Sequence, residues 1–161
     1  IKKTIWTDTL MTEINPIKGG ARSSARLAAV QALYQIEASD AKSLLVVQEF
    51  SDHRINETID DDCFAKADNK FFQDIVLGVE QRSEEIDKQL SENLKKDWSL
   101  ERIESVARAI LRAGAYELLA RPDVPTSVII NEYIDVTKAF YEDSTPGFVN
   151  GVLDKIAKIN R

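Results

Sequence analysis

One apolar stripe, between residues 99 and 118, constrains the fold of this chain more than any other feature of its sequence. Its apolar and small residues recur with the spacing of an α-helix over about five turns, at Ile103, Val106, Ala107, Ile110, Leu111, Gly114 and Leu118. Because a helix buries such a stripe, we expect a central core helix with Ser99 as its N-cap. Pro122 and Pro125 lack the amide hydrogen that a helix needs, so a tight turn is expected there.

Stripes with the same spacing on both sides of this segment predict an all-α fold with about six or seven helices. The expected helices lie at 23–38 with Ser23 or Ser24 as the N-cap, from Ser43 onward, across 71–94 as two helices or one bent helix, at 128–140, and from Thr145 onward with Pro146 in the first position. No segment alternates with the period of two that a half-buried strand requires, so no sheet is expected.

The length of 161 residues suits one globular domain. Residues 1–20 show no periodicity and end in two glycines, and we predict a flexible N-terminal arm followed by a helical domain at 21–161. Residues 55–70 are polar and acidic, and we interpret them as a connecting loop. The spacing of Gly147 and Gly151 is that of close helix contacts, and it predicts tight packing of the last helix.

The composition argues against several kinds of chemistry. Cys63 is the only cysteine, so no disulfide forms within the chain, and a reducing, cytoplasmic setting is expected. With His53 as the only histidine, four Cys and His ligands for zinc are not available. The sequence has no phosphate-binding glycine loop, no nucleophile elbow and no apolar run near the length of a membrane span. The run Asp60–Asp62 fits a solvated loop better than a cation site. We therefore expect no catalysis, no metal site and no cofactor.

Charge is distributed unevenly along the chain. The net charge is −6 and the isoelectric point is near 4.9, which argues against general coating of nucleic acid. Residues 1–26 nevertheless hold five basic and two acidic side chains, whereas residues 40–62 hold two basic and seven acidic ones. The basic segment is a candidate phosphate clamp, because cationic side chains release counterions from nucleic acid and helix N-termini attract anions. The alternative is that these charges only keep the arm in solution.

A series of short motifs follows in a distinctive order along the chain. The motifs are Ala29–Tyr34, Arg112 followed by Tyr116–Leu118, Asp123–Pro125, Ile130–Glu132 and Phe148–Lys155. In order and spacing they resemble the motifs of the bacterial transcription antitermination factor NusB family. The resemblance extends from about Ala21 to the C-terminus and does not include the arm. It implies an all-helical domain of two packed helical subdomains, without catalysis.

The resemblance also implies partners. Proteins of the NusB family pair with NusE, a ribosomal protein of the small subunit, and the heterodimer binds the single-stranded boxA element of ribosomal RNA leaders. That complex helps a modified RNA polymerase to read through terminators. RNA, NusE and the RNA polymerase antitermination complex are therefore the expected partners, and no membrane is expected among them.

The resemblance carries over to individual residues. The positions that match the RNA surface of the family are Lys18, Arg22, Arg26, Gln31, Tyr34, Asp143, Phe148 and Asn150, and those that match its partner surface are Arg112, Tyr116 and Glu117. Such a mixture suits single-stranded RNA, because amides contact base edges, aromatic rings stack on bases and arginines hold the backbone.

These assignments have alternatives. Ser23 and Ser24 stand where some relatives have consecutive arginines, so weaker RNA binding by the chain alone is expected. Tyr34 and Phe148 also lie on apolar stripes and suit core packing equally well. The partner-surface residues on the central helix could instead form a structural ion pair or a cap for the proline turn.

Two other functions remain open at the level of the sequence. The same kind of domain precedes the catalytic domain of a ribosomal RNA methyltransferase, a hypothesis that requires an α/β domain with a methyl-donor site after Arg161. A homodimeric interaction module without a role in RNA binding is the second possibility, since some relatives self-associate.

Overall fold

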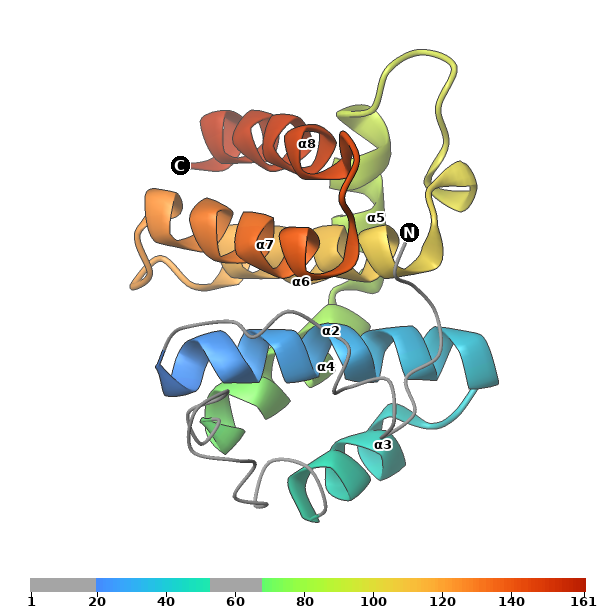
Figure 1. The fold of residues 1–161 in the computed structure, drawn as a ribbon, viewed down its shortest axis with the longest axis vertical. Coiled ribbons are helices and arrows are strands. Elements are labelled where there is room, and N and C mark those ends of the chain that lie inside the picture. Colours follow the sequence, from blue (N-terminus) through green and yellow to red (C-terminus); the bar gives the residue numbers. More distant parts are fainter. Residues whose placement is uncertain (1–19, 53–67) are drawn as a thin grey trace.

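The computed structural model describes residues 20–52 and 68–161, and helices make up most of these ranges, with a long connection between α5 and α6 (Figure 1). The helices are α2 (Ala21–Ser39), α3 (Ser43–Phe50), α4 (Asn69–Gln81), α5 (Ser83–Glu92), α6 (Ser105–Ala120), α7 (Thr126–Phe140) and α8 (Thr145–Asn160), with a short 3-10 helix η2 (Leu100–Arg102). No strand occurs within the described ranges, and the predicted all-α fold is confirmed.

The helices form two groups that pack on each other. Helices α2, α3 and α4 contact one another, as do α6, α7 and α8, and α2 lies against both α4 and α6 (Figure 1). This arrangement agrees with the expected pair of helical subdomains. Residues 1–19, which include Lys18, and residues 53–67, which include His53, Cys63 and Asp60–Asp62, lie outside the described residues.

The first helix begins earlier than predicted. Gly20 is the N-cap of α2 and offers no side-chain cap, while Ser23 and Ser24 lie inside the helix and are buried. Ser23 therefore does not cap the helix; its hydroxyl donates to Glu132 Oε1 at 2.8 Å, on α7. At the other end, Asp40 closes α2 in the left-handed conformation, with φ of 53°. Between α4 and α5 the chain bends at Arg82, so the segment predicted as two helices or one bent helix forms two.

The prediction that Ser99 caps the central helix is wrong. Ser99 precedes η2, and α6 begins six residues later with Glu104 at its N-cap position. Between them Ile103 takes an extended conformation with its side chain buried, which interrupts the helix. The guanidinium of Arg108 donates to the carbonyl oxygens of Ile103 at 2.6 Å and Leu100 at 3.2 Å, and so ties η2 to the first turn of α6. The carbonyl of Leu100 also accepts from the amide of Ile103 at 3.2 Å.

The prediction of tight packing at Gly147 and Gly151 is also wrong. Both glycines are exposed, and a Cβ added to either would meet no atom within 4 Å. Close approach occurs instead at Gly78, where an added Cβ would lie 2.3 Å from the ring of Tyr116, and at Gly114, where it would lie 2.9 Å from Leu153.

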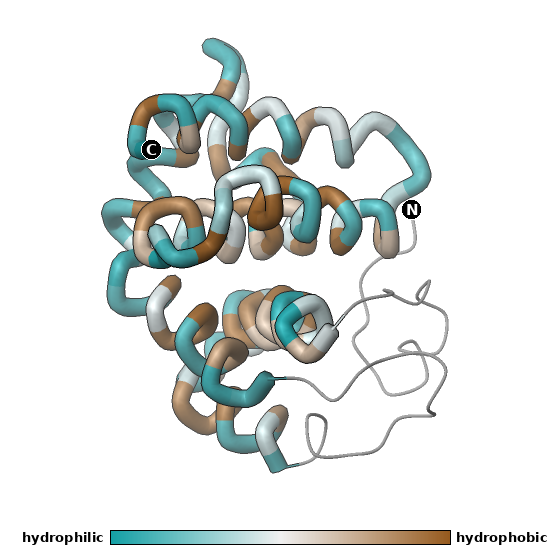
Figure 2. The backbone as a smooth tube through the Cα atoms, turned by 90° about the vertical axis from the view of Figure 1, so that its left-hand side faces the viewer, coloured by the Kyte–Doolittle hydropathy of each residue, from teal (hydrophilic) through white to brown (hydrophobic). Residues whose placement is uncertain are grey.

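Hydrophilic and hydrophobic residues alternate around each helix (Figure 2). Among the described helices, none combines the length and apolarity that crossing a bilayer would require.

Candidate nucleic-acid interface

A buried ion pair lies where α2, α6 and α7 meet. Arg26 is 2% exposed, and its Nε and Nη2 each donate to the carboxylate of Glu117 at 2.9 Å. Tyr133 donates its hydroxyl to the same carboxylate, and Glu132 lies 3.5 Å from Arg26 Nη1. Burial raises the pKa of Tyr133 well above its usual value, and the negative charge of Glu117 raises it further.

This pair gives Arg26 and Glu117 a structural role. In the described conformation neither side chain is open to solvent, so Arg26 does not reach a phosphate and Glu117 does not reach a partner protein. The expectation of direct contact at these two residues does not fit the structure. The structural ion pair that was the alternative for Glu117 does fit, and its second member is Arg26.

One arginine of the basic segment remains accessible at the start of α2. The side chain of Arg22 is 48% exposed, with its guanidinium 4.6 Å from the ring centroid of Phe71 and 4.0 Å from Asp68. Arg26 and Arg121 also lie over Phe71, at 4.9 and 5.1 Å. The first turn of α2 has no side-chain cap, so the positive end of the helix dipole lies beside Arg22. Together these features favour an anionic group at this end of α2.

The middle of α2 exposes less of the two predicted RNA-binding side chains, Gln31 and Tyr34, than the sequence predicted. Gln31 is 1% exposed, and its amide faces the protein interior. Tyr34 is partly buried and packs against the hydrophobic core. Of the two residues, only Tyr34 has surface that a bound molecule could contact in this conformation.

Three candidate residues come together at the start of α8. Asp143 is exposed, and its Oδ1 accepts from the amide and hydroxyl of Thr145 at 2.9 and 2.6 Å. These hydrogen bonds from Thr145 lower the pKa of Asp143 and keep it ionised. Phe148 is partly buried and Asn150 is exposed. The residues that mark the turn into α8 in the sequence therefore share one end of the helix, with polar groups open to solvent.

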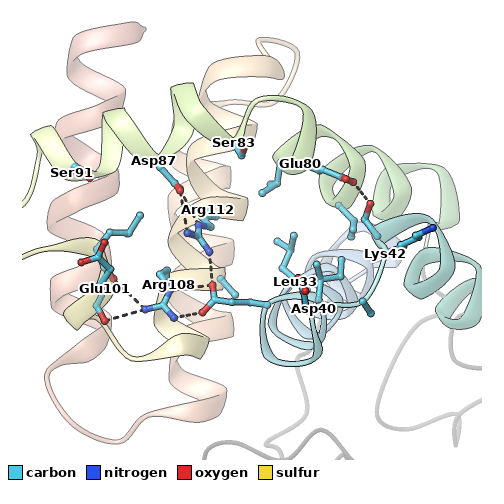
Figure 3. A pocket seen from close by; sticks show the side chains of 18 of the residues that line it. Leu33, Asp40, Lys42, Glu80, Ser83, Asp87, Ser91, Glu101, Arg108 and Arg112 are labelled. Atoms are coloured by element: carbon cyan, nitrogen blue, oxygen red, sulfur yellow. Dashed lines mark hydrogen bonds and ion pairs between the residues drawn. The ribbon is translucent and has the colours of Figure 1, made fainter.

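A groove of about 1220 Å³ opens between the two helical groups (Figure 3). It is bounded by α5 and η2, by the ends of α2 and α4, and by the starts of α3 and α6. Arg112 lies in it and donates to Asp87 at 2.9 and 3.1 Å and to Glu37 at 2.5 Å. Arg108 donates to the same Glu37 carboxylate. The hydrogen bonds from Arg108, with those from Arg112, hold the pKa of Glu37 below its usual value.

The three candidate partner-surface residues on α6 do not share a surface. Arg112 lines the groove, whereas Tyr116 is 6% exposed and donates its hydroxyl to Asp74 at 2.7 Å on α4. Burial and that carboxylate raise the pKa of Tyr116 to about 12. Glu117 belongs to the buried ion pair. Of the three, only Arg112 lies where a partner could contact it.

Sequence reasoning did not single out Trp98, Glu37 or Arg108. Trp98 lines the groove and also lies 6.2 Å, centroid to centroid, from the ring of Phe148. An indole within the polar stretch 95–99 was a signal that could have identified it. Glu37 and Arg108 looked like ordinary charges on helix surfaces, because their pairing depends on how α2 packs against α6.

The geometry defines an all-helical domain of two groups, with accessible polar side chains at the start of α2 and the start of α8 and a charged groove between the groups. The NusB family model matches residues 23–158, and the chain belongs to the NusB family. The chain is 49% identical over 137 residues to the transcription antitermination protein NusB of Caulobacter vibrioides, with 85% of this chain and 92% of that protein covered. Its identity to NusB of Novosphingobium aromaticivorans is 51% over 142 residues, covering 88% and 96%.

Solved structures have the same fold. The chain is similar to T. maritima NusB with a TM-score of 0.69 and 34% identity, covering 85% of this chain and 90% of that one. A structure of the antitermination factors NusB and NusE in complex with dsRNA matches with a TM-score of 0.72 over 85% and 96% of the two chains, and at 23% identity this match shows the shared fold alone.

Proposed function

We propose that this chain is a transcription antitermination factor that binds single-stranded boxA RNA of ribosomal RNA leaders together with NusE and promotes read-through of terminators. The observation that carries the proposal is its identity of about one half to NusB proteins, which extends over both helical groups and over 92% of the Caulobacter protein. The proposed activity is binding and assembly with RNA polymerase, with no catalytic step. It takes place where RNA is made, so we assign the chain to the cytoplasm.

The proposed RNA surface begins at Arg22 and continues to the start of α8. Arg22 and the uncapped first turn of α2 suit a phosphate, and Lys18 of the preceding arm would add a second cation. Tyr34 and Phe148 supply partly exposed rings. Asn150 supplies an amide that can donate to and accept from a base edge, and Asp143 accepts hydrogen bonds from exocyclic amines.

Arg26 and Gln31 act on this surface indirectly. Arg26 holds the first turns of α2 against α6 and α7 through Glu117, and so fixes the direction of Arg22 on the same helix. Gln31 is buried on the side of α2 that faces the core. Both residues position the helix that carries the RNA contacts.

The groove is the proposed docking surface for NusE. Arg112 lies on its wall, and apolar side chains such as Leu33, Val76 and Val79 line it beside the charged network. Protein–protein interfaces commonly combine apolar and charged side chains in this way. Tyr116 and Glu117 support α6 from within instead of contacting the partner.

RNA binding is tested by fluorescence anisotropy with labelled single-stranded boxA RNA over a series of salt concentrations. The chain alone should bind weakly and more tightly with NusE, with log affinity falling against log salt by about 0.7 for each phosphate neutralised. Arg22→Ala should flatten that slope by about 0.7. Arg22 lies beside the start of α4, whereas Arg82 follows the end of that helix, so Arg82→Ala should leave the slope unchanged. An affinity that does not respond to NusE contradicts the proposal.

The docking surface is tested by titrating NusE against charge-reversed variants. Arg112→Glu should weaken NusE binding at least tenfold, because it places a carboxylate beside Asp87 and Glu37 in the groove. Lys158→Glu, an equally large change on the exposed face of α8, is the control and should leave NusE binding unchanged. A homodimer that persists in gel filtration after addition of both RNA and NusE would contradict the heterodimer.

A further inference from the structure

Trp98 has an unusual environment for a large apolar side chain. It lies between α5 and η2 and is 49% exposed. One neighbour is Phe148 of α8, whose ring is tilted by 40° at a centroid distance of 6.2 Å. The other is Arg102, whose guanidinium lies 5.5 Å from the centroid of the indole. About half of the surface of Trp98 is thus open to solvent, and its ring also contacts an aromatic and a cationic group.

The backbone holds this tryptophan in place. The amide of Trp98 donates to the carbonyl of Lys95 at 2.9 Å, and Arg102 Nη1 donates to the carbonyl of Asp97 at 2.8 Å. Ile103 directly follows η2, and its buried side chain anchors the end of this segment to the core. The backbone around Trp98 is therefore held by hydrogen bonds, and the contacts of the ring with Phe148 and Arg102 restrict its rotamers, which lowers the side-chain entropy that binding costs.

The local charge differs in sign from that of the whole chain. Residues 95–102 contain three basic side chains, Lys95, Lys96 and Arg102, and two acidic ones, Asp97 and Glu101, which is a balance of +1 in a chain of net charge −6. All of these charged residues are exposed. An open aromatic ring beside lysines and an arginine is the combination that binds single-stranded nucleic acid, because bases stack on the ring and phosphates lie near the cations.

We propose that Trp98, supported by Phe148 and Arg102, is a base-stacking residue that extends the RNA surface from the start of α8 onto the segment between α5 and η2. The inference rests on the proposed RNA binding of this chain. It assigns one unpaired base of boxA RNA to the open part of the indole, at the border between the RNA surface and the groove proposed for NusE, which Trp98 also lines. Its ring contact with Phe148 makes Trp98 continuous with the proposed RNA residues Phe148 and Asn150.

Tryptophan fluorescence provides a direct test. The chain has two tryptophans, so Trp6→Phe leaves Trp98 as the only one. Titration of this variant with boxA RNA should quench its emission, with the same midpoint as the anisotropy of the labelled RNA. Emission that RNA leaves unchanged but NusE alone shifts would overturn the assignment and place Trp98 in the protein interface.

Substitutions separate stacking from general apolar contact. Trp98→Leu should lower RNA affinity about tenfold or more, Trp98→Phe should keep it within about threefold, and both should retain the salt slope because no phosphate contact changes. Leu45→Ala is the control, since Leu45 is 62% exposed on α3, and it should bind RNA normally. Far-ultraviolet circular dichroism of each variant should match that of the unsubstituted chain.

An abasic nucleotide moved along the RNA identifies the stacked base. At one position it should weaken binding to the unsubstituted chain and have little further effect on Trp98→Leu, because the lost contact is the same in both. Wild-type affinity of Trp98→Leu overturns the assignment of Trp98 alone. Absence of RNA binding by the unsubstituted chain in the presence of NusE overturns the proposed function and the assignment together.

Discussion

Two clusters of arginines and carboxylates join α2 to α6, and they differ in how much water reaches them. Arg26 and Glu117 are 2% and 0% exposed in one cluster, whereas Glu37 is 34% exposed in the other, where it contacts Arg108 and Arg112. The chemistry is the same, but only the second can exchange its partners for water or for another protein. The buried pair therefore fixes the relation of the two helical groups, and the open network provides a surface.

The largest effect should come from removing one charge of the buried pair. Glu117→Gln leaves the guanidinium of Arg26 buried without its main counter-charge, and we expect a loss of about 3 kcal/mol or more in the free energy of unfolding. Urea unfolding followed by circular dichroism measures it. A loss below about 1 kcal/mol would mean that the two clusters do not differ as their burial implies.

Replacing both members of the buried pair should lower the free energy of unfolding less than replacing one. Arg26→Met combined with Glu117→Leu removes both charges and keeps much of the volume, so most of the stability lost in Glu117→Gln should return. The residual loss, about 1–2 kcal/mol, reflects the hydroxyl of Tyr133, which then lacks its acceptor. Equal instability of the single and double variants would show that shape, and not the uncompensated charge, is responsible.

The open network should contribute much less. Glu37→Gln removes the carboxylate that Arg108 and Arg112 share, yet both arginines keep other acceptors, in Ile103 and in Asp87. We expect a loss of about 0.5–1 kcal/mol by urea unfolding, the usual range for partly exposed pairs. A loss as large as that of Glu117→Gln would remove the distinction between the clusters.

The smallest expected effect is a pH dependence of the stability difference between the unsubstituted chain and Glu37→Gln. Arg108 and Arg112 depress the pKa of Glu37 below its usual 4.5 in the folded chain, so its contribution is fully present above that value and is lost as pH falls through the folded pKa. The stability difference between the unsubstituted chain and Glu37→Gln should therefore be constant from pH 7 to about 5 and shrink at lower pH. A difference that grows on acidification would contradict the assigned pairing.

Helices were predictable from the sequence because their signal is local. The period of apolar residues located the helices, but it left the end of α3 open and misplaced the start of α6, where the chain is extended at Ile103. Gly147 and Gly151 show a related limit. Their spacing places them on one face of α8, and only the packing of that helix determines that this face is exposed.

The candidate site was predictable only where exposure follows from a turn or a helix start. Arg22, Asp143 and Asn150 are accessible, as their proposed roles require. Arg26 belongs to the same basic segment but is buried, because Glu117 provides a carboxylate 91 residues away in the sequence. Nothing near Arg26 in the sequence signals that partner.

The separation of Arg26 from Glu117 has a consequence for how the protein is made. A chain that leaves the ribosome N-terminus first exposes α2, α3 and α4 while α6 and α7 are still unsynthesised. During that interval the guanidinium of Arg26 stays hydrated, and the face of α2 around it stays exposed to water. The packing of α2 against α6 and α7 therefore forms only after the segment carrying Glu117 and Tyr133 has emerged, and this step closes a long loop.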